Sequence, residues 1–311
     1  MALFIGAGTG QGQVDGRIPQ PDRSRLAEAV RLAEAVRHAV WPGWERTAMP
    51  VLFVAESSEF LIDHRPPGTG FTPLGHDSLL RGEIWSRPRR FPPTLLATFP
   101  AVAGRPTIVV GSAERTGKSP REWVLTLLHE HFHQWQSSLP GYYGRVAALD
   151  LARGDTTGRW MLDYPFPYDS APVQRAVSDL AASLNRALSA PPDERTDALL
   201  ASVTDRDRLR DLLSPADYRY LEFQLWQEGV SRFVEIAVAE AAGNGYAALA
   251  ARMRGDLKRD LREMSLAHSR RVGFYALGAG LALVLERHRP DWKEAYERRP
   301  FVLAELLPAG P

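Results

Sequence analysis

Hydrophobic and polar positions follow two different periods along this chain. Short apolar runs separated by proline and glycine fill residues 50–111, and they predict strands at residues 51–54, 60–62, 82–85, 95–99 and 107–110. From residue 119 onward, apolar residues recur every three or four positions, which is typical of helices that bury one face. The pattern therefore predicts an α+β, predominantly helical chain with a small N-terminal mixed sheet.

The helical pattern also suggests how the chain is organised. We expect helices at residues 25–40, 119–138, 171–190, 193–213 and 214–242, and a final long helical stretch over residues 246–289. Residues 1–20 are rich in glycine and glutamine and are predicted to be flexible. Residues 21–140 form a sheet-containing N-terminal part and residues 141–311 a helical C-terminal part, together one catalytic unit.

The helix predicted from residue 119 has a strong start signal and a strongly apolar composition. Ser119, Pro120 and Glu122 match an N-cap, a proline at the first helical position and a capping-box carboxylate. Tryptophan, leucine, valine and phenylalanine surround the following turns, so we expect the whole helix to be buried. The strand predicted at residues 107–110 precedes it, and an edge strand beside such a helix can hold an extended substrate.

This helix carries the sequence His129-Glu130-His131-Phe132-His133, which fits the pattern H-E-x-x-H. His129 and His133 lie one turn apart on one face, where two imidazoles can share a zinc ion. Glu130 beside them can act as general base toward a zinc-bound water. His131 points away from that face and is expected to be a core histidine or one that supports the ligands, rather than a ligand itself. The metal-free alternative is that all three histidines are satisfied structurally.

A third zinc ligand is expected from the helix over residues 214–242. Glu228 lies among apolar residues, and a buried carboxylate needs a partner, either a metal ion or a basic side chain such as Arg232 or Arg271. Gly229 follows it, and a glycine inside a helix suggests a close approach by another group, such as the motif helix or a metal. The next candidate ligands are Glu222 and Glu235.

Further catalytic candidates lie in the last helical stretch. Tyr275 or His268 could donate a hydrogen bond to the oxyanion of a tetrahedral intermediate, and we select Tyr275. Gly278 and Gly280 follow it, and they give that helix a small-residue face that permits close packing. A purely structural role for either candidate remains the alternative.

Composition narrows the possible partners. The 311 residues carry a formal net charge of +1, so the chain lacks the basic excess of a nucleic-acid-binding protein. No apolar segment approaches the length of a membrane span, and the N-terminus does not resemble a signal peptide. The absence of cysteine means that a zinc site must use histidine and carboxylate ligands. The compartment stays open, cytoplasmic or exported if a signal was removed.

The motif His129-Glu130-x-x-His133 with the later Glu228-Gly229 resembles the zincin metallopeptidases, and within them the gluzincin branch. The resemblance implies one Zn²⁺ per chain held by His129, His133 and Glu228, with Glu130 as general base. It further implies a zincin-like domain and a zinc-dependent hydrolase, most of all a metallopeptidase acting on a peptide or protein. The alternative is a zincin-fold protein without turnover that serves as a binding or regulatory module.

Overall fold

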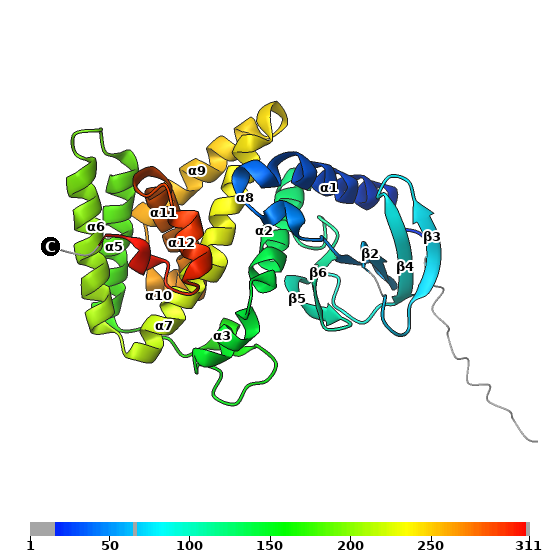
Figure 1. The fold of residues 1–311 in the computed structure, drawn as a ribbon, viewed down its shortest axis with the longest axis horizontal. Coiled ribbons are helices and arrows are strands. Elements are labelled where there is room, and N and C mark those ends of the chain that lie inside the picture. The colour runs from blue at the N-terminus through cyan, green and yellow to red at the C-terminus, as the bar shows by residue number, and fades with distance from the viewer. Residues whose placement is uncertain (1–15, 65–66, 309–311) are drawn as a thin grey trace, which may run out of the picture. The chain divides into compact units, whose positions relative to one another are not determined.

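The computed structural model describes residues 16–64 and 67–308 of the chain, which divides into two compact units (Figure 1). Unit 1 contains Met1–Leu32 and Ala48–Gln134, and unit 2 contains Ala33–Thr47 and Trp135–Pro311. Two helices, α1 (Gln20–Val40) and α2 (Pro120–Ser138), contribute residues to both units. The predicted flexibility of residues 1–20 falls mostly on residues 1–15, outside the described part, while α1 already begins at Gln20.

Unit 1 is built on a six-stranded mixed sheet with the strand order β3-β4-β2-β1-β6-β5. β1 pairs in parallel with β6, and the other neighbouring strands are antiparallel. The strands are β1 (Val51–Val54), β2 (Ser58–Ile62), β3 (Thr72–Asp77), β4 (Gly82–Pro88), β5 (Leu96–Val102) and β6 (Arg105–Gly111). Within the described residues, β5 and β3 are the two edge strands.

The hydrophobic pattern predicted five of these strands and missed β3. β3 has the sequence TPLGHD, in which every residue but the last is exposed. An exposed edge strand buries no face and shows no apolar alternation, and its proline and glycine indicate a turn. The central strands β1 and β2 are buried on both faces, which is why their apolar runs gave a clear signal.

One face of the sheet packs around a compact apolar cluster, and a buried ion pair lies in the same unit. The cluster contains Leu52, Val54, Leu61, Val102 and Val109. The carboxylate of Glu59, fully buried in β2, accepts a hydrogen bond from Arg87 Nε at 2.7 Å. It also accepts the backbone N–H groups of Arg90 and Phe91, at 2.7 and 2.6 Å. These bonds tie the chain beyond β4 to β2.

Unit 2 is helical. Its elements are α3 (Tyr142–Ala148), α4 (Trp160–Asp163), α5 (Ala171–Ser189), α6 (Arg195–Leu212), α7 (Pro215–Gln224), α8 (Val230–Ala241), α9 (Ala247–Arg262), α10 (Leu266–Ser269), α11 (Gly273–His288) and α12 (Trp292–Arg298). A π-helical turn, Leu225–Gly229, joins α7 to α8, and a short 3₁₀ turn, Ala304–Leu306, lies near the C-terminus. α5 and α6 pack side by side (Figure 1).

Two predicted helices differ from the structure. The helix expected over residues 214–242 is present, but the π-helical turn interrupts its α-helical hydrogen bonding. The long stretch expected over residues 246–289 is broken after Arg262 into α9, α10 and α11, with Arg270 at a positive φ of 44°. Since residues 263–272 contain neither proline nor glycine, the break carries no sequence signal. The chain is therefore α+β and mostly helical, as predicted, with a less regular C-terminal part.

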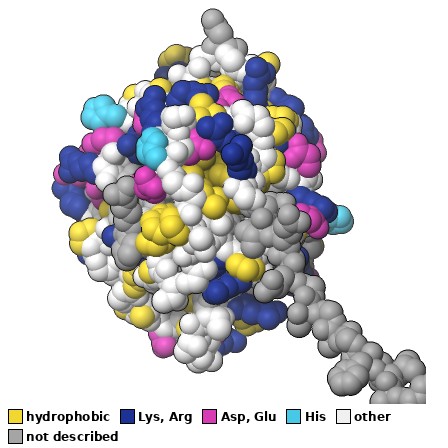
Figure 2. All heavy atoms as spheres, turned by 90° about the vertical axis from the view of Figure 1, so that its right-hand side faces the viewer, with side chains coloured by type: hydrophobic (Ala, Val, Ile, Leu, Met, Phe, Trp, Pro, Cys, Tyr) yellow, Lys and Arg dark blue, Asp and Glu magenta, His cyan; other side chains and the backbone are white. Residues whose placement is uncertain are grey.

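The surface shown in Figure 2 carries basic and acidic side chains interspersed with hydrophobic ones. Among the described helices, none combines the length and the apolar character needed to cross a lipid bilayer.

Candidate metal centre

The motif helix α2 is capped and buried as its sequence predicted. The backbone N–H of Ser119 donates to the carboxylate of Glu122 at 3.0 Å, which is one half of a capping box. Every residue from 123 to 136 is buried. On the unit 1 part of the helix, the indole of Trp123 donates to the carbonyl of Gly111 at 2.9 Å, at the end of β6. α2 is thus fixed against the sheet at its first turn.

His129 and His133 direct the same ring nitrogen toward each other. Their Nε2 atoms lie 3.2 Å apart, and their ring planes cross at 81°. Only 6% of His129 and 8% of His133 is exposed. The helix therefore holds two imidazoles in one place, largely shielded from water, as the one-turn spacing predicted.

Glu130 completes this cluster with an unsatisfied oxygen. Potential ligand atoms of His129, Glu130 and His133 all lie within 4.8 Å of one another, and Glu130 is 6% exposed. Its Oε2 atom is buried and has no hydrogen-bond partner among the described residues. Buried carboxylate oxygens are almost always hydrogen-bonded, so we expect this atom to bind a ligand, a water molecule or a proton.

The distances within the cluster are compatible with a metal ion bound by both histidines. Two nitrogens at about 2.0–2.1 Å from one tetrahedral zinc ion lie about 3.3 Å apart. The observed 3.2 Å between the histidine nitrogens matches that value. A water that makes two hydrogen bonds of about 2.8 Å spans up to about 5.6 Å, so the Glu130 carboxylate is close enough to act through a water. The same 3.2 Å contact also suits a hydrogen bond between two neutral imidazoles, which is the metal-free alternative.

The neighbouring histidine has a structural role. His131 is fully buried, and its Nδ1 lies 2.9 Å from Oε1 of Gln134. The amide nitrogen of Gln134 donates to the carbonyls of Pro50 and Pro106 at 2.9 and 3.2 Å. The carbonyl of Pro50 directly precedes β1, and the carbonyl of Pro106 lies at the start of β6. His131 therefore belongs to a polar connection between α2 and the sheet, as expected of a core histidine.

Sequence reasoning did not anticipate a contact from the edge strand β5. The hydroxyl of Thr98 donates to the backbone carbonyl of Glu130 at 3.0 Å. A carbonyl in the middle of a helix is normally occupied by the helix itself, so this bond fixes β5 against the motif turn. The sequence offers little signal for it, since a threonine in a strand is common.

Glu228, the predicted third ligand, belongs to unit 2, whereas the two histidines belong to unit 1. Its pairing with them stays a prediction. Glu228 lies in the π-helical turn, and such turns are frequent at functional sites. Its carboxylate lies 3.6 Å from Nη1 of Arg271, one of the basic partners that the sequence offered as an alternative to a metal.

Tyr275 lies beside the same carboxylate. The hydroxyl of Tyr275 accepts a hydrogen bond from Nη1 of Arg271 at 3.1 Å. Burial, followed by the charge of Glu228, raises the pKa of Tyr275 well above its ordinary value. The phenol therefore stays protonated and has a hydrogen to donate, as an oxyanion-stabilising group must, and Glu228 is its hydrogen-bond partner in this structure. Its contact with a reacting group stays a prediction.

The close approach expected at Gly229 comes from α11. A Cβ atom on Gly229 would overlap the Cα atom of Gly278. The close neighbour of Gly229 is therefore the backbone of α11, within unit 2. The small-residue face expected for α11 permits this close approach.

The remaining candidates have other surroundings. Glu235 accepts a hydrogen bond from Arg232 at 2.7 Å. Glu222 is bound by Tyr218 and by the backbone of Ala304. His268, the alternative oxyanion donor, is exposed on α10.

Comparison of the chain with protein-family models gave no match, and the comparisons with curated proteins and with solved structures gave no significant match either. The functional assignment therefore depends on the side chains of the site.

Proposed function

We propose that the protein is a zinc-dependent hydrolase and, within that class, a metallopeptidase. The observation that carries the proposal is the buried pair of histidine nitrogens, 3.2 Å apart, beside an unsatisfied oxygen of Glu130. Two neutral nitrogen donors and one free carboxylate are the protein groups that a water-activating zinc site requires. A bound zinc ion would supply Lewis acidity and would lower the pKa of a bound water molecule to about 7.

The protein groups would divide the work as follows. His129 and His133 would hold the ion by their Nε2 atoms. The carboxylate of Glu130 would accept the proton of the attacking water and later return it to the leaving amine. Burial of all three residues excludes bulk water, which strengthens the electrostatic interactions of the site.

The position of β5 supports a peptide substrate. β5 is an edge strand that pairs with β6 alone among the described strands, so one side of its backbone is not used in the sheet. Extended peptides bind to such edges by main-chain hydrogen bonds. Thr98 of this strand contacts the carbonyl of Glu130, so a peptide along β5 would pass close to the general base.

Glu228 is proposed as the third ligand on its sequence alone, with Tyr275 as the oxyanion donor. Substituting Glu228 by alanine tests the first assignment by zinc affinity. A large loss of affinity supports it, whereas full retention assigns the third position to another group. Tyr275→Phe tests the second assignment: kcat falls while zinc content stays constant if the hydroxyl contacts the transition state.

The rival is a zinc-binding module without turnover. A peptide-library assay of the wild-type chain and of Glu130→Gln separates the two, because glutamine cannot accept the proton. Cleavage that disappears in the variant, with zinc still bound, supports the hydrolase. Zinc binding with no cleavage by the wild type of any peptide supports the module.

A further inference from the structure

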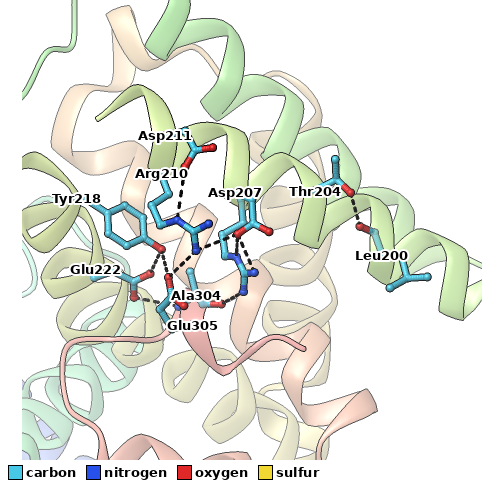
Figure 3. A network of polar contacts seen from close by, with 10 residues as sticks. Leu200, Thr204, Asp207, Arg210, Asp211, Tyr218, Glu222, Ala304 and Glu305 are labelled. Atoms are coloured by element: carbon cyan, nitrogen blue, oxygen red, sulfur yellow. Dashed lines mark hydrogen bonds and ion pairs between the residues drawn. The ribbon is translucent and has the colours of Figure 1, made fainter. Parts of the chain in front are cut away.

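Helix α7 and the 3₁₀ turn Ala304–Leu306, both in unit 2, meet in a polar network (Figure 3). The hydroxyl of Tyr218, in α7, lies 3.0 Å from Oε1 of Glu222 and 2.7 Å from Oε1 of Glu305. A hydroxyl has one hydrogen to donate, and an ionised carboxylate can only accept. If both carboxylates were ionised, one of these short contacts would hold no hydrogen. Both short contacts are best satisfied by a second proton on one of the two carboxyl groups.

Burial decides which carboxyl group carries that proton. Glu222 is 2% exposed. The side chain of Glu305 is 29% exposed and has Nη1 of Arg210 at 3.6 Å. Burial raises the pKa of Glu222 to about 8, although the N–H of Ala304 and the Tyr218 hydroxyl oppose that rise. Glu222 is therefore the neutral member of the pair.

The surrounding charges agree with this assignment. Two arginines of α6, Arg206 and Arg210, approach the network, and Figure 3 labels Arg210. Arg206 donates to Asp207 at 2.9 and 3.0 Å and to the carbonyl of Ala304 at 3.1 Å. Arg210 lies 3.1 Å from Asp207 and 3.7 Å from Asp211, in addition to its contact with Glu305. Both cations are thus engaged by other anions, which weakens their ability to favour the charged form of Glu222.

We propose that Glu222 is a neutral carboxylic acid whose proton fastens the C-terminal segment, residues 301–307, to α7. Glu222 donates to the oxygen of Tyr218, and Tyr218 donates to Glu305 of that segment. The other oxygen of Glu222 accepts the backbone N–H of Ala304 at 3.0 Å. Loss of the proton places a second negative charge beside Glu305 and loosens the segment. The network thereby makes the attachment of this segment sensitive to pH.

The segment is part of the core of unit 2, so its release has structural consequences. Leu303 and Leu306 are 0% and 1% exposed. The ring of Phe301 lies 4.9 Å from that of Trp226, which belongs to the π-helical turn. The proposal does not depend on zinc binding, because none of His129, Glu130, His133 and Glu228 takes part in the network.

The direction of the pH effect follows from the raised pKa. A glutamate in an opened or unfolded chain has a pKa near 4.5, below the value of about 8 in the folded state. Between these two values, opening releases a proton, and the opening equilibrium constant rises by up to about tenfold per pH unit. Above the folded pKa the constant levels off. Attachment of the segment is therefore strongest in acid and weakens as the pH rises toward 8.

Amide hydrogen exchange at Ala304, corrected for the intrinsic exchange rate, measures this opening in the full chain. We expect the opening constant of the wild type to rise by more than about tenfold between pH 6 and pH 8. Glu222→Gln keeps a donor and an acceptor but does not titrate, so it should remove that rise. Glu294→Gln, an exposed change on α12, should leave it intact. Equal pH dependence in the wild type and Glu222→Gln would overturn the proposal.

A measurement on the wild type alone covers the case in which Glu222→Gln does not fold. Carbon-13 NMR of the labelled glutamate carboxyls follows the titration of Glu222 directly. A midpoint far above the ordinary value of 4.5 supports the proposal. A midpoint at the ordinary value would show an ionised Glu222 at neutral pH and would contradict it.

Discussion

At the scale of single residues, the most informative atom is Oε2 of Glu130. It is buried without a hydrogen-bond partner among the described residues, while the backbone carbonyl of the same residue is bound by Thr98. The main chain is fixed and the side chain is left unsatisfied, an arrangement that suits a group acting on a ligand or a water. The H-E-x-x-H spacing predicted the identity of this residue, but the unsatisfied oxygen is visible only in the fold.

Replacing Glu130 by glutamine tests its proposed role. Glutamine preserves the shape of the side chain but cannot take the proton of a water, so we expect peptide hydrolysis to fall by about 10²–10⁴-fold. Zinc content should not change, since the proposed ligands on this helix are the histidines. Steady-state kinetics and elemental analysis on the same sample check both expectations. Unchanged turnover would remove Glu130 from the mechanism.

A second prediction concerns the buried ion pair of Glu59 and Arg87. Glu59 is fully buried and accepts three hydrogen bonds, so its loss leaves a buried guanidinium without its partner. We expect Glu59→Gln to lower the free energy of unfolding by about 3–5 kcal/mol. Glu56→Gln is the matched control, because the pair of Glu56 with Arg115 is exposed and should contribute less than about 1 kcal/mol. Urea denaturation measures both changes, and similar effects of the two would refute the prediction.

At the scale of elements, the helix contact between the π-helical turn and α11 depends on two glycines. A Cβ atom on Gly278 would lie 2.6 Å from the Cα atom of Gly229 and 2.7 Å from the carbonyl oxygen of Leu225. Both obstacles are backbone atoms, which cannot move away as a flexible side chain could. The helices must therefore separate if either glycine gains a side chain.

Gly278→Ala should consequently destabilise the chain by about 1–3 kcal/mol through overpacking. Gly255→Ala provides the control, since Gly255 lies in α9 and an added Cβ atom would meet no described atom within 4 Å beyond its own helix backbone. Alanine is there the better helix former, by about 0.5–1 kcal/mol. Thermal or urea unfolding should thus shift in opposite directions for the two variants. A neutral Gly278→Ala would mean that the two helices do not pack this closely.

The elements also show what a sequence can and cannot predict. α2 was predictable because its start signal, its apolar surround and its histidine spacing all indicate the same helix. The π-helical turn at Glu228 was not predictable, because one added residue in a mostly buried helix leaves no mark on its apolar pattern. The break at residues 263–272 was missed for a related reason: Arg270 adopts a positive φ without a glycine.

At the scale of the whole molecule, the sheet and the helices fall into two compact units, each with its own buried interior. Periodicity predicted the α+β class, since the change from short runs to a helical period is strong. The histidine pair and Glu130 were predictable because all three lie within two turns of one helix. Ligands and donors from distant segments depend on long-range packing that no local pattern encodes, so Glu228 and Tyr275 stay predictions.

Zinc stoichiometry tests the central claim most directly. Elemental analysis of the purified wild type, after reconstitution with zinc and removal of the excess, should give one zinc per chain. His133→Ala should lose it, and His268→Ala, an exposed histidine outside the motif, should keep it. No zinc in a folded wild type, or equal zinc in the wild type and His133→Ala, would contradict a metal centre at His129 and His133.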